Sequence, residues 1–128
     1  MDTTRTQQII TCAKKYPEVS LLMLFGSRAR GQANEHSDWD FAYIATKNFD
    51  STPLYVELTL ILGTDKVDLV NLSKATALLR FRVTQDGKPL YESREGEYEK
   101  FWLQAVDFWC DAGPIIRAEY EALLRRIA

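Results

Sequence analysis

The sequence has few of the residues that build disulfides and metal centres. It contains two cysteines, Cys12 and Cys110, and one histidine, His36. The cysteines are far apart and belong to no Cys-x-x-Cys or Cys/His ligand pattern, which excludes a disulfide framework and a zinc site and favours a reducing cytoplasm. A Ser-His-Asp hydrolase would depend on His36, which lies near no nucleophile elbow, so we interpret it as a surface loop residue.

The chain also lacks an excess of one charge and any long apolar run. Its 16 basic and 18 acidic residues give a formal net charge of −2, which argues against nucleic-acid binding through nonspecific phosphate attraction. No stretch approaches the ~20 apolar residues that span a bilayer. The polar start, Met1 to Thr6, leads into no apolar segment typical of an export signal. We therefore expect a cytoplasmic protein without a membrane segment.

The hydrophobic content and the length of the chain are sufficient for one domain with a single hydrophobic core. Hydrophobic residues make up 46% of the 128 residues, which predicts a single domain over 1–128, with a core over about 1–92 and a helical part over about 93–128. Apolar periodicity and turn signals predict helices over about 3–16, 53–63, 75–85, 95–111 and 114–126, and strands over 19–25, 39–45, 67–70 and 89–91. A strand is the alternative for 53–63. This order indicates an α/β (α+β) fold with a small mixed sheet and flanking helices.

The turn after the first predicted strand has features of a phosphate-binding corner. Gly26 has no Cβ, so a ligand can approach its backbone closely. Ser27 adds a hydroxyl, and a short helical turn over 27–31 would direct amides and the positive end of its dipole at an anion. Arg28 and Arg30 are candidates for further phosphate contacts. Taken alone, the dipeptide is more typical of an ordinary strand-to-helix turn, because such dipeptides are common.

Three aspartates are candidate metal ligands. Asp38 and Asp40 stand two apart, so in an extended chain both carboxylates project from one face while Trp39 projects from the other. Their mutual repulsion is relieved by a cation, and carboxylate oxygens suit Mg²⁺ or Mn²⁺. Asp68 lies among apolar residues in another predicted buried strand, where an unpaired charge is costly. If the strands are neighbours, the three carboxylates converge opposite Gly26.

Simpler interpretations exist for each carboxylate. Asp38 and Asp40 would then mark a solvated strand end, and Asp68 an edge-strand charge or a partner of Arg80 or Lys66. The joint order and spacing of the glycine-serine turn and the three acids favour a shared site over these separate explanations.

The same residues resemble a known signature. Gly26-Ser27, ten intervening residues, Asp38-Trp39-Asp40 and the later Val67-Asp68-Leu69-Val70 are similar to the motif of DNA polymerase β-like nucleotidyltransferases. The run Gly26-Ser27-Arg28-Ala29-Arg30-Gly31 resembles that of the minimal nucleotidyltransferase (MNT) group, and similarity continues to Tyr91. The resemblance implies the polymerase β-like fold.

The resemblance also implies an activity and a partner. Asp38, Asp40 and Asp68 would hold two Mg²⁺ ions, Ser27 would contact the phosphates of ATP, and Asp68 would assist deprotonation of the attacking hydroxyl. Many members are antitoxins that transfer AMP from ATP to a tyrosine of a HEPN ribonuclease toxin. Two alternatives stay open: neutralisation by binding alone, and transfer to a small acceptor such as an aminoglycoside.

The C-terminal residues predict packing faces. Six apolar residues favour packing over a cofactor site: Phe101, Trp102, Leu103, Val106, Phe108 and Trp109. The last predicted helix is amphipathic and suits either a core-covering or a partner-docking role. Its apolar side is Ile116, Tyr120, Leu123, Leu124 and Ile127, and its polar side is Arg117, Glu121, Arg125 and Arg126.

Overall fold

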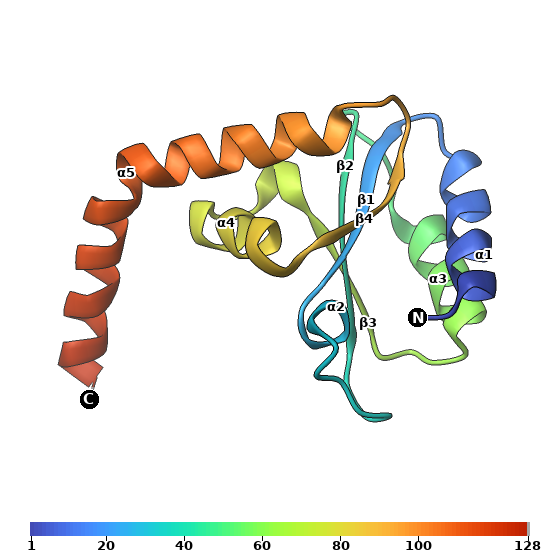
Figure 1. Ribbon diagram of the computed structural model, residues 1–128, viewed down its shortest axis with the longest axis horizontal. Helices are drawn as coiled ribbons and strands as arrows, with labels where there is room; N and C mark the ends of the chain where they lie inside the picture. Colours follow the sequence, from blue (N-terminus) through green and yellow to red (C-terminus); the bar gives the residue numbers. More distant parts are fainter. Residues whose placement is uncertain (128) are drawn as a thin grey trace.

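The computed structural model describes residues 1–127, apart from the side chains of Ala112, Ile116, Tyr120 and Ile127 and the burial of Gly113. Four strands form one mixed sheet in the order β3-β2-β1-β4 (Figure 1). The strands are β1 (Val19–Phe25), β2 (Trp39–Ala45), β3 (Val67–Asn71) and β4 (Lys88–Glu92). Strand β1 pairs antiparallel with β2 and β4, whereas β2 and β3 are parallel. The short helix α2 (Ser27–Arg30) follows β1 directly.

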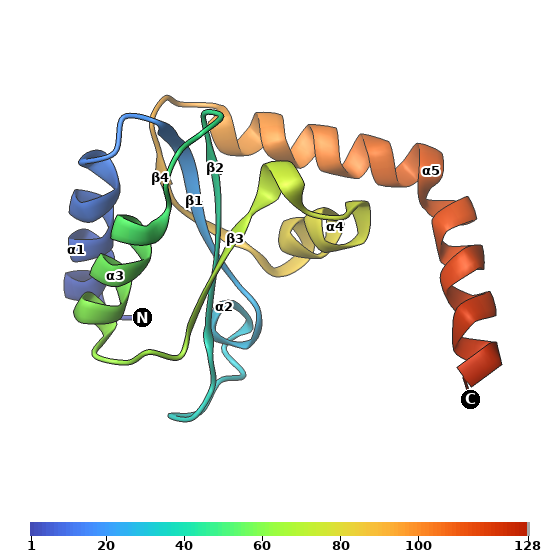
Figure 2. The same cartoon turned by 180° about the vertical axis from the view of Figure 1, so that it is seen from behind.

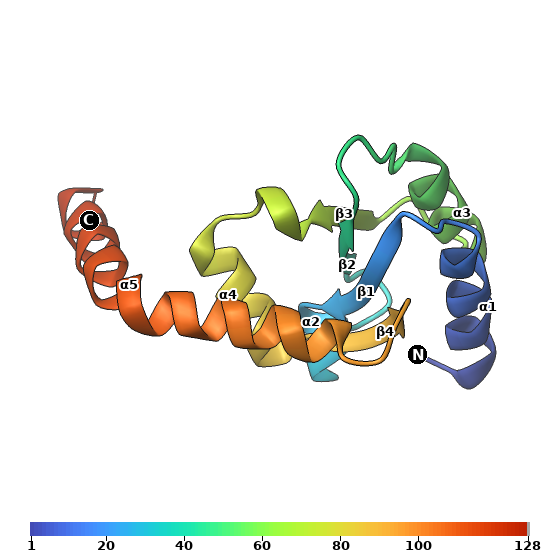
Figure 3. The same cartoon turned by 90° about the horizontal axis from the view of Figure 1, so that it is seen from above.

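Helices cover both faces of the sheet, as Figures 2 and 3 show. On one face lie α1 (Thr3–Lys14) and α3 (Thr52–Leu62), and on the other lie α4 (Ala77–Asp86) and the first half of α5 (Glu97–Ile127). The Asp2 carboxylate caps α1 by accepting the Arg5 amide at 2.7 Å. The Thr76 hydroxyl caps α4 in the same way.

Each face of the sheet has its own apolar core. Alternation along β2 directs Phe41 to the α1 and α3 side and Ala42 to the α4 and α5 side. Phe41 packs with Leu54 and Leu58 of α3, whereas Ala42 packs with a cluster that includes Phe101 of α5. Two-sided burial explains why β1 and β2 are nearly continuous apolar runs.

Most predicted elements are present, with shifted ends. Strands β1 and β2 match the predicted 19–25 and 39–45, and the segment predicted as 53–63 is helix α3, so the strand alternative is wrong. Helix α1 ends at Lys14 rather than 16. The helix predicted over 75–85 begins at Ala77, because a short 3-10 helix, η1 (Leu72–Lys74), comes first.

The C-terminal prediction of two helices is wrong. Helix α5 runs through Pro114 without interruption, and Figure 1 shows it bending sharply about halfway along its length. Proline removes one helical hydrogen bond and its ring crowds the preceding turn, which bends a helix that flanking residues can still hold together. Within residues 1–127, no helix has the length and apolar character needed to cross a membrane.

Candidate active site

The turn at Gly26 brings β1 into contact with an acidic side chain of β2. Gly26 has φ 76° and ψ −160°, a conformation essentially reserved for glycine. A Cβ built at this position would lie 2.3 Å from Oδ2 of Asp40. The absence of a side chain at Gly26 therefore leaves the space that the Asp40 carboxylate occupies. Helix α2 has a single turn, so it offers a few amides at Ser27 and Arg28 rather than an extended dipole.

The three predicted acids lie at the same end of the sheet. Asp40 lies opposite Phe25 in the antiparallel pair and opposite Asp68 in the parallel pair. Asp38 stands two residues before Asp40, directly before β2, and its negative charge acts on the Asp40 carboxyl group. Trp39 points to the other face and is 6% exposed, as the sequence predicts. The structure thus brings Asp38, Asp40 and Asp68 together at the end of the sheet next to Gly26.

Asp40 is the central and most enclosed of these carboxylates. Its pKa is raised, first by burial and then by the negative charges of Asp68, Asp38 and Asp86, while Arg30 opposes the shift. The site therefore carries more negative charge than its neighbours neutralise. A divalent cation would remove this penalty.

The donor set fits a hard divalent cation by its chemistry. Three carboxylates on neighbouring strands offer only oxygen ligands, which Mg²⁺ and Mn²⁺ prefer. Among residues 1–127, no three His, Cys, Asp or Glu side chains are already gathered closely enough to hold an ion. Binding of an ion by all three carboxylates would therefore require their side chains to move closer together.

The predicted environment of Asp68 is wrong in one respect. Asp68 is exposed, because β3 is an edge strand of the sheet. Its charge is therefore solvated, and burial does not make it depend on a cation.

The two arginines predicted near the phosphates have protein partners. The Arg28 guanidinium donates to the carbonyl oxygens of Ser37 at 2.9 Å and Asn34 at 3.2 Å, and it lies 4.0 Å from the ring centroid of Trp39. These contacts brace the loop before β2. Arg30 forms an ion pair with Asp86 at 2.6 Å. A phosphate contact by either arginine stays a prediction.

Asp86 is a site residue that sequence reasoning missed. It ends α4, beside the Arg30 side chain, and its charge raises the pKa of Asp40. Its Oδ1 is buried and has no hydrogen-bond partner among the described residues. The sequence gives no signal for this role, since Asp86-Gly87 is typical of a turn. His36, by contrast, is exposed in the loop, as expected.

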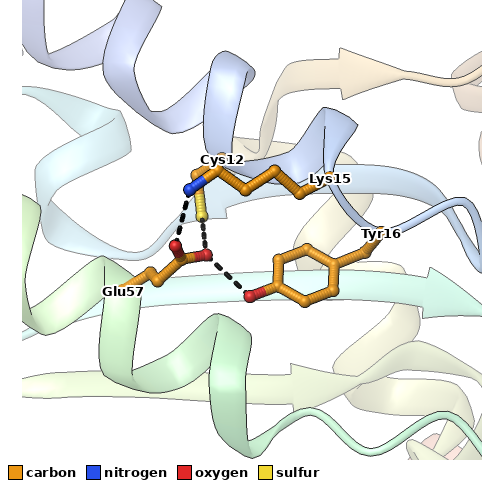
Figure 4. Close-up of polar contacts among 4 residues, drawn as sticks. All are labelled: Cys12, Lys15, Tyr16 and Glu57. Carbon is orange, nitrogen blue, oxygen red and sulfur yellow. Dashed lines mark hydrogen bonds and ion pairs between the residues drawn. The ribbon is translucent and has the colours of Figure 1, made fainter.

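A second polar cluster lies between α1 and α3, on the sheet face opposite the acids (Figure 4). The Glu57 carboxylate accepts hydrogen bonds from Cys12 Sγ at 3.0 Å, Lys15 Nζ at 2.7 Å and Tyr16 OH at 2.6 Å. These donors hold the pKa of Glu57 at about 2, while burial raises the pKa of Cys12 to about 12. A surface hollow of about 620 Å³ borders the cluster. The cluster joins two helices and satisfies its own polar groups.

Comparison with known proteins gives consistent matches. The family described as "Polymerase beta, Nucleotidyltransferase" matches residues 7–96, which include all three acids. A protein from Aphanizomenon flos-aquae named protein adenylyltransferase MntA is 38% identical over 101 residues. The alignment spans 68% of this chain and 66%, just under two thirds, of that relative's length.

Solved structures extend the similarity to α5. A chain in a crystal structure of a toxin–antitoxin with AMP-PNP has a TM-score of 0.76 at 28% identity, covering 95% of this chain and 97% of that one. A chain in the structure of a tri-AMPylated Shewanella oneidensis HEPN toxin in complex with its MNT antitoxin has a TM-score of 0.72 at 26% identity. The latter alignment covers 99% of this chain and 98% of that one.

Proposed function

Because the chain belongs to the polymerase β nucleotidyltransferase family, we propose that it transfers AMP from ATP to a tyrosine hydroxyl of a HEPN-type ribonuclease toxin. This transfer would neutralise the toxin and make the chain an antitoxin. The observation that carries the proposal is the register of β2 and β3, which sets Asp40 opposite Asp68 beside Gly26. A relative named protein adenylyltransferase and a complex containing an AMPylated HEPN toxin support the choice of acceptor.

The chain's own residues have distinct roles in this reaction. Ser27 and the amides of α2 hold the phosphates of ATP beside the Asp40 carboxylate, which packs against Gly26. Asp38, Asp40 and Asp68 hold Mg²⁺, or Mn²⁺, in the site. When bound, the cation supplies positive charge that offsets the charge of the triphosphate. The complex with AMP-PNP supports ATP as the substrate.

The transfer exchanges one phosphorus–oxygen bond for another. The tyrosine oxygen attacks the α-phosphorus, the bond to the β-phosphate oxygen breaks, and pyrophosphate leaves. Asp68 accepts the proton of the tyrosine hydroxyl. Because Asp68 is exposed on the edge strand, the hydroxyl of a folded protein can reach it without displacing part of the sheet.

We also propose that the protein acts in the cytoplasm and on a protein rather than on nucleic acid. Cys12 and Cys110 are both unpaired thiols, which favours the reducing cytoplasm. The net charge of −2 favours a protein acceptor over direct binding of nucleic acid.

The test is transfer of labelled AMP, with Mg²⁺ present, to the product of the neighbouring gene, which the proposal identifies as a HEPN-type toxin. Wild type labels the toxin, and Asp38→Ala loses the label because one metal ligand is gone. Asp65→Asn is the matched control, since Asp65 is an exposed aspartate just before β3 and keeps full transfer. An unlabelled toxin with wild type, or equal labelling with Asp38→Ala, rejects the proposal.

Two alternative functions predict different results, one in a cell-protection assay of the same variants and one in a reaction without toxin. If neutralisation requires binding alone, Asp38→Ala and Asp40→Ala still protect cells from the toxin. If the acceptor is a small molecule, wild type consumes ATP and modifies that molecule, an aminoglycoside for instance, with no toxin present.

A further inference from the structure

The end of α5 carries an apolar stripe that the domain leaves uncovered. We call residues 115–127 the arm. Of the stripe predicted from sequence, the structure describes the side chains of Leu123 and Leu124, which are 52% and 43% exposed. Ile115, directly after the bend, is 66% exposed. Ile116, Tyr120 and Ile127 belong to the predicted stripe, and their side chains lie outside the described part.

Before the bend, the same helix buries its apolar side. Phe101, Ala105 and Trp109 recur every four residues and are 1%, 3% and 7% exposed. Phe101 and Ala105 pack in the core that includes Val83 of α4. Leu103 and Phe108, predicted as packing residues, are instead 49% and 56% exposed. The arm thus continues a helix that packs on the domain, and its apolar content is comparable to that of the packed half. Within the described residues, Leu123 and Leu124 remain about half exposed.

The arm extends from the side of the sheet that bears the acids. Asp40 projects from the same face of β2 as Ala42, which packs with the core of the α4 and α5 side, and Asp38 lies directly before β2. Figures 1 and 3 show α5 leaving this side of the sheet, with the arm turning beyond the bend to the side of α5 on which α4 lies and standing apart from α4. A protein held by the arm therefore stands on the side where the acids are exposed.

We propose that the apolar stripe of the arm is the docking element for the acceptor toxin, a refinement that rests on the proposed function. The fitting partner surface is an apolar groove with acidic groups at its rim, because Arg125 and Arg126 are exposed beside Leu123 and Leu124. The chain aligned over 99% of this one was solved in a complex with a toxin, so a counterpart of the arm exists in a toxin-bound protein.

The position of the arm favours the acceptor over a second copy of this chain. A reaction between two proteins needs the acceptor to be held on the acid-bearing side, and the arm provides binding area there. An arm occupied by a second copy would place another domain on that side and obstruct the acceptor. A contiguous apolar patch that a soluble protein leaves exposed marks an interaction site.

The test is the double variant Leu123→Arg/Leu124→Arg, assayed for AMP transfer at varied concentrations of the toxin and of ATP. We expect KM for the toxin to rise about tenfold or more, because two apolar contacts become unpaired charges. KM for ATP stays unchanged, since the arm is remote from Gly26. The melting temperature also stays unchanged, because both leucines are about half exposed.

The matched control is Val56→Arg/Leu60→Arg on α3, on the opposite face of the sheet. Val56 and Leu60 are 47% and 75% exposed, so the control introduces the same charges without touching the arm, and its KM for the toxin equals that of wild type. An unchanged KM in the arm variant overturns the proposal.

Light scattering of the chain alone tests the other occupant. If wild type forms a dimer, the arm variant is a monomer, and transfer to the toxin is unaffected, the stripe binds a second copy of the chain. That result overturns the proposal. If wild type transfers no AMP, the proposed function fails, and calorimetric binding of toxin by wild type and by the arm variant still decides the docking role.

Discussion

Replacing Gly26 with alanine tests whether the turn after β1 fixes the position of the Asp40 carboxylate. The new Cβ would lie 2.3 Å from Asp40 Oδ2, where ordinary contacts begin at 3.4 Å, so the carboxylate must retreat by roughly 1 Å. A displacement of this size at a reacting centre costs about 100-fold in rate. The backbone at φ 76° and ψ −160° adds about 1–3 kcal/mol of strain for alanine. This lowers the melting temperature by roughly 5–10 °C for a domain of this size.

The assay separates the two effects with a second glycine. Gly63 ends α3 at φ 69°, and a Cβ there meets no atom within 4 Å. Gly63→Ala therefore loses about 1 kcal/mol of stability from backbone strain and keeps wild-type transfer. Thermal unfolding and kcat/KM for AMP transfer are measured for both variants. Wild-type kcat/KM in Gly26→Ala would refute the claim that Gly26 positions Asp40.

Two further predictions concern the charges on either face of the sheet. In metal-free buffer at pH 7, Asp40→Asn melts at the same temperature as wild type or higher. The folded-state pKa of Asp40 is raised, so its ionisation opposes folding at neutral pH, and the difference disappears below about pH 4 in a pH series of melting curves. A lower melting temperature for Asp40→Asn at pH 7 contradicts this. Glu57→Gln has a lower melting temperature than wild type at pH 7. Its free energy of unfolding falls by about 1 kcal/mol or less, because the carboxylate is partly exposed. The folded-state pKa of Glu57 is about 2, so this contribution is present above its unfolded pKa and falls as pH drops towards 2. A pH-independent difference argues against the ionised carboxylate as its source.

The parts of the fold that sequence predicts well are those where one local signal dominates. Strands β1 and β2 are nearly continuous apolar runs closed by polar or glycine residues, and their predicted bounds are confirmed. The proximity of Asp38 and Asp40, whose charges interact, follows from their being two residues apart at the start of β2. The position of Asp68 opposite Asp40 depends on the parallel pairing of β2 and β3, which the sequence alone left conditional.

The errors arise where tertiary contacts outweigh local preference. Gly113-Pro114 predicts a helix end, yet α5 continues through it with a bend. The apolar neighbours of Asp68 predict burial, but an edge strand is covered on fewer sides than a central one. The ion pair between Arg30 and Asp86 joins residues 56 positions apart, and no local pattern reveals such a pair.

The exposure of Asp68 has a consequence for the acceptor. In a central strand, the neighbouring strands would flank Asp68 on both sides, and only a small molecule could approach it from the open face. At the edge of the sheet, one side of Asp68 meets solvent, and a charged residue there also discourages pairing with the strands of another molecule. The edge position therefore allows a tyrosine on a protein surface to approach the carboxylate while it limits sheet extension. For the proposed transfer, the exposure of Asp68 and the proposed protein acceptor are related, because only an exposed base can serve so large an acceptor.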